Sequence, residues 1–151
     1  MDETLLRVAE VIATRSTCSR LAVGAVLARD GRVLSTGYNG APSGLSHCEH
    51  YTGLKRSTSE LAGGGCKTAV HAEANAIAFA AKHGVRVEGS VLYTTHSPCN
   101  TCAFLIINAG VVKVVYGLLY RDFSGLTTLE DAGVVVQSAA EKEPPITELD
   151  E

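Results

Sequence analysis

Two short motifs constrain what this chain of 151 residues can fold into. The first is HAEANAIAFAA, which begins at His71, and the second is SPCNTC, which ends at Cys102. Histidine and cysteine side chains are the usual zinc ligands in proteins. A fold that uses both motifs should therefore bring His71 close to Cys99 and Cys102.

Each motif also carries the signals of a helix start. Alanine-rich helical spacing begins at His71 and continues to about residue 83, where a glycine ends it. A proline precedes Cys99, as the first turn of a helix tolerates, and the second helix should continue through residue 108. Free N–H groups and the dipole at a helix start favour thiolate over thiol at Cys99 and Cys102.

His71, Cys99 and Cys102 make three protein ligands and leave one tetrahedral position open, which is the arrangement of catalytic zinc. Zinc lowers the pKa of a bound water from about 16 to about 7. Glu73 lies on the same first turn as His71, where it can take that proton and pass it on. Taken singly, His71 could be a helix-cap histidine and Glu73 a surface acid favoured by the helix dipole.

Together the motifs match H-x-E…P-C-x-x-C, the signature of zinc-dependent nucleobase deaminases. In that reaction hydroxide adds to the ring carbon that bears the amine, Glu73 protonates the ring nitrogen and then the amine, and ammonia leaves. The rival outside enzymes is a zinc-stabilised nucleotide-binding module without chemistry. Glu73 argues against this rival, because a purely structural metal site has no use for an acid at an open position.

Periodicity in the rest of the chain predicts an α/β domain. Asp30-Gly31 between two β-rich runs predicts a hairpin, and alternating strands and helices after residue 70 predict a mostly parallel sheet. We expect the domain to span residues 1–138 and the acidic segment 139–151 to be a flexible tail. The other expected elements are helices at 3–15 and 127–133, strands at 90–95, 111–117 and 134–137, and a functional loop at 39–68.

Composition argues against several partners. Residues 141–151 hold five acidic residues and one lysine, so the remainder, with 12 basic and 11 acidic residues, is nearly neutral. A surface for long nucleic acid would need more basic and aromatic side chains than this chain, which is 5% aromatic. No stretch reaches the roughly 18 apolar residues of a membrane span, and the acidic start MDETLL does not resemble a signal peptide. We therefore expect the protein in the cytoplasm of the producing or infected cell, with no membrane partner.

Four stretches resemble the deoxycytidylate (dCMP) deaminase family of bacteria and phages: STCSRLAVGAVLARDGRVLSTGYNGAPSG, HCEH, CKTAVHAEANAIAFAA and SPCNTCAFLIINAGVVKVVYG. The resemblance implies a three-layer cytidine-deaminase-like fold, with a mixed five-stranded sheet and helices on both faces. It implies hydrolysis of dCMP to dUMP and ammonia, which would supply thymidylate synthesis. It further implies a homo-oligomer, usually a hexamer, that dCTP activates and dTTP inhibits, with Mg²⁺ accompanying a triphosphate effector.

Substrate-binding residues are expected around the two motifs. In similar enzymes the asparagine that matches Asn39 reads a sugar hydroxyl, although an Asn-Gly pair can also serve a turn alone. Tyr120 follows a buried strand and could stack on the base, and Arg121 could face the phosphate. We also expect Ala72 and Ser97, beside the metal ligands, to contact the substrate. The resemblance places Gly37, Tyr38 and Gly40 in an effector site.

The five cysteines are odd in number, which favours metal ligands over a disulfide framework in a chain without a secretion signal. Cys18, Cys48 and Cys66 match cysteines of related deaminases that carry a structural metal. A closed zinc site needs a fourth ligand, for which we expect His50, with His47 as its rival. The alternative is that these cysteines are three ordinary thiols.

His96 stands directly before SPC, where relatives more often have an apolar residue. We hypothesise that His96 meets a substituent at the 5-position of cytosine, so that a 5-modified dCMP is an alternative substrate. Deaminases of tRNA adenosine, of guanine and of riboflavin precursors share both motifs. The nearly neutral body of this chain argues against an RNA substrate.

Overall fold

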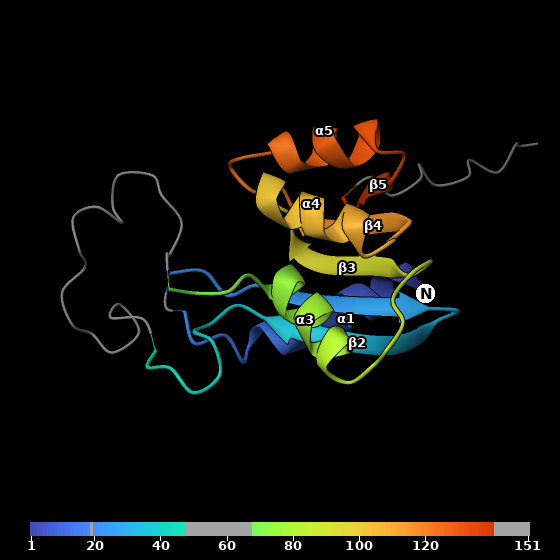
Figure 1. The fold of residues 1–151 in the computed structure, drawn as a ribbon. Coiled ribbons are helices and arrows are strands. Elements are labelled where there is room, and N and C mark those ends of the chain that lie inside the picture. Colours follow the sequence, from blue (N-terminus) through green and yellow to red (C-terminus); the bar gives the residue numbers. More distant parts are fainter. Residues whose placement is uncertain (19, 48–67, 141–151) are drawn as a thin grey trace, which may run out of the picture.

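The computed structural model (Figure 1) describes residues 1–18, 20–47 and 68–140. Its helices are α1 (Asp2–Ala13), α3 (Ala72–Lys82), α4 (Asn100–Asn108) and α5 (Ser124–Asp131). Its strands are β1 (Gly24–Arg29), β2 (Arg32–Tyr38), β3 (Val91–His96), β4 (Lys113–Leu118) and β5 (Val135–Ser138). None of these helices is long and apolar enough to cross a membrane.

The strands form one five-stranded sheet in the order β2-β1-β3-β4-β5. β3, β4 and β5 are mutually parallel, whereas β1 is antiparallel to both of its neighbours, β2 and β3. The expectation of a mixed five-stranded sheet is therefore confirmed. The mostly parallel sheet predicted from strand–helix alternation is limited to β3–β5, because the N-terminal hairpin joins β3 through an antiparallel edge.

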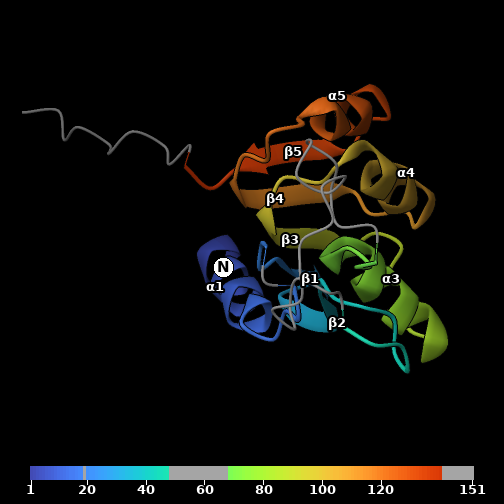
Figure 2. The ribbon, with the colours of Figure 1, turned by 90° about the vertical axis from the view of Figure 1, so that its left-hand side faces the viewer.

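Helices cover both faces of this sheet, which confirms the three-layer fold. Figure 2 shows α1 on one face and α3, α4 and α5 on the other. Side chains of a strand alternate between the two faces, and β1 shows how both are filled. Ala25 and Leu27 belong to the core beneath α3 and α4, whereas Val26 and Ala28 belong to the core beneath α1.

The hairpin between β1 and β2 forms where the Asp30-Gly31 pair predicts it. Asp30 has a φ of 52° and Gly31 a φ of 72°, and Arg29 pairs with Arg32 across the turn. Two consecutive positive φ values match the right-handed twist of the flanking strands. The turn therefore sets the register of β2, which carries Gly37 and Tyr38 toward the start of α3.

Gly37 allows β2 to lie very close to the first turns of α3. A Cβ atom placed on Gly37 would lie 2.2 Å from the carbonyl oxygen of Ala72 and 2.5 Å from the nitrogen of Ala76. Just beyond β2, Gly40 and Val70 exchange two backbone hydrogen bonds of 3.2 and 2.8 Å. These contacts fix the chain on both sides of His71, the first residue of the predicted metal site.

α5 begins at Ser124, three residues before the predicted start of this helix. The carboxylate of Asp122 accepts a 3.0 Å hydrogen bond from the backbone N–H of Ser124, which satisfies a free donor of the first turn. The expected strand after α5 is present as β5, which ends at Ser138. Residues 141–151 of the expected tail lie outside the described residues.

Candidate active site

The starts of α3 and α4 carry the three predicted metal ligands. His71 occupies the N-cap position of α3, and Cys99 occupies the N-cap position of α4. Cys102 lies in the first turn of α4, where it is buried. The two helices pack side by side, so residues from motifs about 30 positions apart in the sequence meet at one end of this layer.

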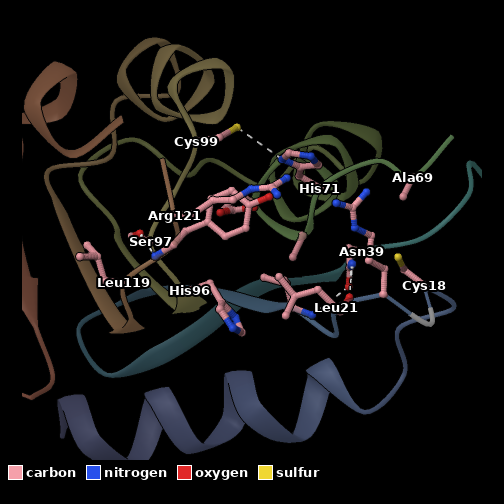
Figure 3. Close-up of a pocket in the computed structure, with 15 residues that line it drawn as sticks. Cys18, Leu21, Asn39, Ala69, His71, His96, Ser97, Cys99, Leu119 and Arg121 are labelled. Atoms are coloured by element: carbon pink, nitrogen blue, oxygen red, sulfur yellow. Dashed lines mark hydrogen bonds between the residues drawn. The ribbon is translucent and has the colours of Figure 1, made fainter. Parts of the chain in front are cut away.

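The distances among these side chains fit zinc. Nδ1 of His71 lies 3.4 Å from Sγ of Cys99 and 3.5 Å from Sγ of Cys102 (Figure 3). In tetrahedral coordination, Zn–N and Zn–S bonds of normal length place nitrogen and sulfur about 3.5 Å apart. The three ligand atoms all lie within 4.8 Å of one another. Among the described residues, these three side chains form the group of His, Cys, Asp and Glu residues that lie close enough together to hold a metal ion. Nδ1 of His71 is thus the nitrogen that faces the metal position.

The two cysteines differ in how readily they lose a proton. A hydrogen bond from Cys102 stabilises the Cys99 thiolate and lowers the pKa of Cys99. The same contact raises the pKa of Cys102, and its burial adds to this rise. A metal cation bound at this position would displace the thiol protons, because zinc binds the thiolate form of cysteine.

Glu73 lies on the first turn of α3, beside the cluster. It is only 4% exposed, and it contributes to the wall of the same cavity as His71 and Cys99. Burial raises the pKa of the Glu73 carboxyl group, because the charged form loses its hydration. A buried carboxyl group next to a metal position can hold a proton as well as release one, as the predicted role of Glu73 requires.

A cavity of about 320 Å³ opens in front of the cluster. This volume is within the usual range for sites that bind small molecules. Besides His71, Glu73 and Cys99, its wall contains every residue that the sequence analysis assigned to the substrate. These residues are Asn39, Ala72, Ser97, Tyr120 and Arg121.

Ser97 joins the two segments that follow β3 and β4. Its backbone N–H donates to the carbonyl oxygen of Leu118 at 2.9 Å, and its Oγ accepts from the N–H of Tyr120 at 2.7 Å. These bonds hold Tyr120 and Arg121 at the carboxyl end of the parallel strands, where α/β sheets commonly bind ligands. The Arg121 guanidinium lies 5.5 Å from the centroid of the Tyr120 ring, so it covers part of the ring expected to stack on a base.

The side chain of Asn39 binds the backbone of a neighbouring segment. Its amide nitrogen donates to the carbonyl oxygen of Leu21 at 2.6 Å, and its amide oxygen accepts from the N–H of Val23 at 2.8 Å. One donor hydrogen and one acceptor lone pair of the amide remain for a ligand. Asn39 therefore shapes the cavity wall around Leu21, whether or not it also meets a sugar hydroxyl.

The residues of the cavity wall that were not predicted from the sequence as substrate contacts include Arg20, Leu21 and Leu119. Arg20 and Leu21 precede β1, and Leu119 follows β4. Local patterns did not predict these contacts, because hydrogen bonds between residues far apart in the sequence bring their segments to the cavity. Arg20 is the most informative of the three, since it adds a second arginine to a wall that already contains Arg121.

His96 also lines this cavity, at the end of β3. In Figure 3 its imidazole points away from His71, and its Nδ1 lies 3.0 Å from the hydroxyl of Thr95. Burial lowers the pKa of His96, which favours the neutral ring. His96 thus lines the cavity without pointing at the metal cluster.

The second predicted zinc site lies largely outside the described residues, which include neither Cys48, His50 nor Cys66. Cys18 is buried in the wall of the cavity, and His47 is exposed. The second zinc therefore stays a prediction.

The residues assigned to an effector site have other contacts in this fold. Besides the close approach of Gly37 to α3, the carbonyl oxygen of Tyr38 accepts a 2.8 Å hydrogen bond from the side chain of Asn75. A Cβ atom placed on Gly40 would lie 2.5 Å from Oγ1 of Thr17. Packing alone therefore accounts for both glycines, and their role in effector binding stays a prediction.

A His-Cys-Cys cluster and a buried glutamate at the starts of two helices, on a three-layer α/β fold, is the arrangement of the zinc-dependent nucleobase deaminases. Residues 1–118 match the model of the cytidine and deoxycytidylate deaminase zinc-binding region. This chain belongs to the cytidine and deoxycytidylate deaminase family.

Individual relatives resemble the chain over most of its length. It is 41% identical to the deoxycytidylate deaminase of Mycobacterium phage D29, over 76% of this chain and 92% of the relative. It is 33% identical to the deoxycytidylate deaminase of Enterobacteria phage T2, over 75% and 77%. Among solved structures, the dCMP deaminase of cyanophage S-TIM5 in complex with dCMP and dUMP superposes with a TM-score of 0.79, at 36% identity, over 90% of this chain and 94% of the other.

Proposed function

We propose that this protein hydrolyses dCMP to dUMP and ammonia. The observation that carries the proposal is one cavity that joins the zinc-spaced His71, Cys99 and Cys102 cluster to a buried glutamate and two arginines. Relatives named for this activity, and a similar structure that contains dCMP and dUMP, support it. The dUMP formed would supply thymidylate synthesis.

His71, Cys99 and Cys102 would hold the zinc ion, and Glu73 would move the protons. When bound, zinc supplies the Lewis acidity that makes water acidic near neutral pH. The Glu73 carboxylate accepts a proton from the attacking water and delivers it to the ring nitrogen. It then accepts the proton of the new hydroxyl group on the ring carbon and delivers that proton to the departing amine. The C–N bond to the amine breaks, a carbonyl remains on the ring, and ammonia leaves with the transferred proton.

Two arginines favour a nucleotide over a nucleoside. Arg20 and Arg121 both line the cavity, and Glu73, the one acid among the described residues of its wall, is buried beside the metal ligands. A guanidinium group binds phosphate oxygens through charge-assisted hydrogen bonds, and Arg121 lies where the sequence analysis expects the phosphate. We infer that this part of the wall receives the 5′-phosphate.

The test is ammonia release from deoxycytidine and from its mono-, di- and triphosphates, where we expect the monophosphate to have the highest kcat/KM. Arg121→Ala should lower kcat/KM for dCMP by about 10- to 100-fold, the effect of losing one charged hydrogen bond, and should leave deoxycytidine unaffected. Arg86→Ala, which removes an exposed arginine bound to Glu88, is the matched control and should change neither value. Zinc-loaded protein that releases no ammonia from any of these substrates would instead support the nucleotide-binding module.

A second candidate substrate is a 5-modified dCMP, which the position of His96 in the cavity wall favours. We predict that His96→Leu changes the relative turnover of dCMP, 5-methyl-dCMP and 5-hydroxymethyl-dCMP, because the substitution replaces a polar ring by an apolar side chain. The measurement is the ratio of the three kcat/KM values. Ratios equal to those of the wild type would remove His96 from substrate choice.

Regulation by nucleotides is part of the proposal and rests on the resemblance of the GYNG segment. We expect dCTP with Mg²⁺ to activate the enzyme and dTTP to inhibit it, through a site that includes Gly37, Tyr38 and Gly40. Adding each triphosphate to the dCMP assay tests this expectation. Rates that neither triphosphate changes would contradict it.

Self-association and a second metal ion complete the proposal. α3 and α4, which pack together, expose Phe79, Phe104 and Leu105, with exposed fractions of 54%, 53% and 42%. The family resemblance implies a homo-oligomer, with a hexamer as the expected state, and we infer that these exposed apolar side chains contribute to contacts between its chains. Light scattering that gives the mass of one 15.8 kDa chain would contradict the oligomer.

The second zinc is tested by metal analysis of the purified protein. A zinc count near one per chain, rather than two, would contradict it.

A further inference from the structure

α5 carries none of the residues assigned to metal or substrate, yet it packs directly behind the metal-binding turn. Its contacts are mainly with α4, and its buried Leu129 belongs to the core that also contains Cys102 and Ile106. In Figure 1, α5 lies above α4, on the side of α4 away from α3. The face of α5 that meets α4 is therefore well placed to control where Cys99 and Cys102 lie.

Gly125 makes the closest contact on this face. A Cβ atom placed on Gly125 would lie 2.2 Å from the carbonyl oxygen of Pro98, and 2.8 Å from both the carbonyl carbon and the carbonyl oxygen of Cys99. Such distances are well inside van der Waals contact, and the atoms concerned are backbone atoms that cannot rotate away. Glycine costs a helix about 1 kcal/mol relative to alanine, so its presence here is best explained by the close approach.

Thr128 makes the second contact, one helical turn after Gly125. Its Oγ1 donates a 2.6 Å hydrogen bond to Oδ1 of Asn100. Asn100 directly follows Cys99 and is the first residue of α4. Residues three positions apart lie on the same face of a helix. Gly125 and Thr128 therefore contact consecutive residues of the metal-binding turn from a single face of α5.

We propose that Gly125 and Thr128 are positioning residues that set the place of Cys99 relative to His71. Gly125 fixes how closely α5 approaches the Pro98–Cys99 backbone, and Thr128 fixes the turn through the side chain of Asn100. Metal sites tolerate errors of about 0.2 Å in ligand position, and loss of residues that orient ligands typically weakens metal binding about 10- to 100-fold. The inference rests on the zinc site of the proposed function, but not on the identity of the substrate.

The test measures zinc affinity by competition with a chromophoric chelator, in the absence of any nucleotide. Thr128→Val keeps the shape of the side chain and removes the hydroxyl group, so we expect zinc affinity to fall by about 10-fold or more. Gly125→Ala should weaken zinc binding at least as much, because the added methyl group must displace the backbone of Pro98 or Cys99. Cobalt-substituted protein should report the same change, as a shift of its thiolate-to-metal absorption bands.

Two variants of the same helix make the result specific. Thr127→Val changes an exposed neighbour in the same way and should keep wild-type zinc affinity. Thr128→Ser restores a hydroxyl group and should keep most of the affinity that Thr128→Val loses. If Gly125→Ala fails to fold, the valine and serine variants of Thr128 decide the question.

Wild-type zinc affinity and an unchanged cobalt spectrum in Thr128→Val would overturn the proposal, as would an equal loss in Thr127→Val. A purely structural role would lower the melting temperature without changing zinc affinity at 25 °C, and would also contradict it. Because the readout needs no substrate, weakened zinc binding supports the inference even if dCMP proves not to be the substrate.

Discussion

Glu73→Gln is expected to reduce the rate of dCMP deamination severely while zinc stays bound. An amide has nearly the shape of a carboxyl group, but it cannot accept a proton from water and deliver it to the substrate. General acid–base catalysis typically contributes about 100- to 10,000-fold to a rate, so kcat should fall by this factor. The assay is ammonia release from saturating dCMP, with zinc content measured on the same preparation.

The matched control is Glu88→Gln, which makes the same chemical change at an exposed glutamate. Glu88 pairs with Arg86 on the surface, away from the cavity, so this variant should retain wild-type kcat. Because Glu73 is buried, its substitution must also be shown to leave the fold intact. Normal zinc content and an unchanged circular dichroism spectrum would show this. A zinc-loaded Glu73→Gln enzyme that keeps more than about a tenth of wild-type kcat would contradict the proton-transfer role.

Local sequence signals predicted the elements that carry the metal ligands. The positions of His71 and Cys99 at helix starts follow from helical spacing, from a proline and from glycines that end each helix. The Asp30-Gly31 turn is equally local, since both residues adopt the positive φ values that this pair favours. Such features depend on residues only a few positions apart, and short-range sequence patterns therefore describe them well.

Features that depend on long-range contacts could not be predicted in this way. The antiparallel pairing of β1 with β3 joins residues about 65 positions apart, and no pattern within either strand specifies its partner. Arg20 and Leu21 reach the cavity because the amide of Asn39 holds the segment from Leu21 to Val23. Gly125 lies outside the helix that the sequence predicts at 127–133, and only the fold places it against the backbone of Cys99.

The same distinction applies to the residues that sequence resemblance assigned to binding. Asn39, Tyr120 and Arg121 do reach one cavity, but the contacts of each within the protein were not foreseen. The Asn39 amide is bonded to the backbone, and Arg121 lies against the ring of Tyr120. A motif thus predicted which residues gather at the site better than it predicted which of their atoms are available to a ligand.

Replacing Cys102 by alanine is expected to remove both activity and the response of stability to zinc. Cys102 is buried, and its Sγ lies 3.5 Å from Nδ1 of His71, so alanine leaves a zinc ion with two of its three protein ligands. A ligand that binds only the folded state stabilises a protein by about 4 kcal/mol at 1,000 times its Kd. For a domain of this size that corresponds to a rise in Tm of roughly 8–16 °C. Wild-type protein should show this rise on zinc addition, and Cys102→Ala should not.

Metal removal and return separate the loss of a ligand from damage to the fold. Wild-type protein stripped by a chelator should lose its activity, and added zinc should restore both activity and the higher Tm. Cys102→Ala given the same zinc should recover neither, although its Tm should lie close to that of stripped wild type, because the substitution removes only one sulfur atom from the side chain. If Cys102→Ala binds zinc as tightly as wild type, Cys102 is not a ligand. If stripped wild type deaminates dCMP at full rate, catalysis does not depend on the metal, and Glu73 would have to activate water unaided.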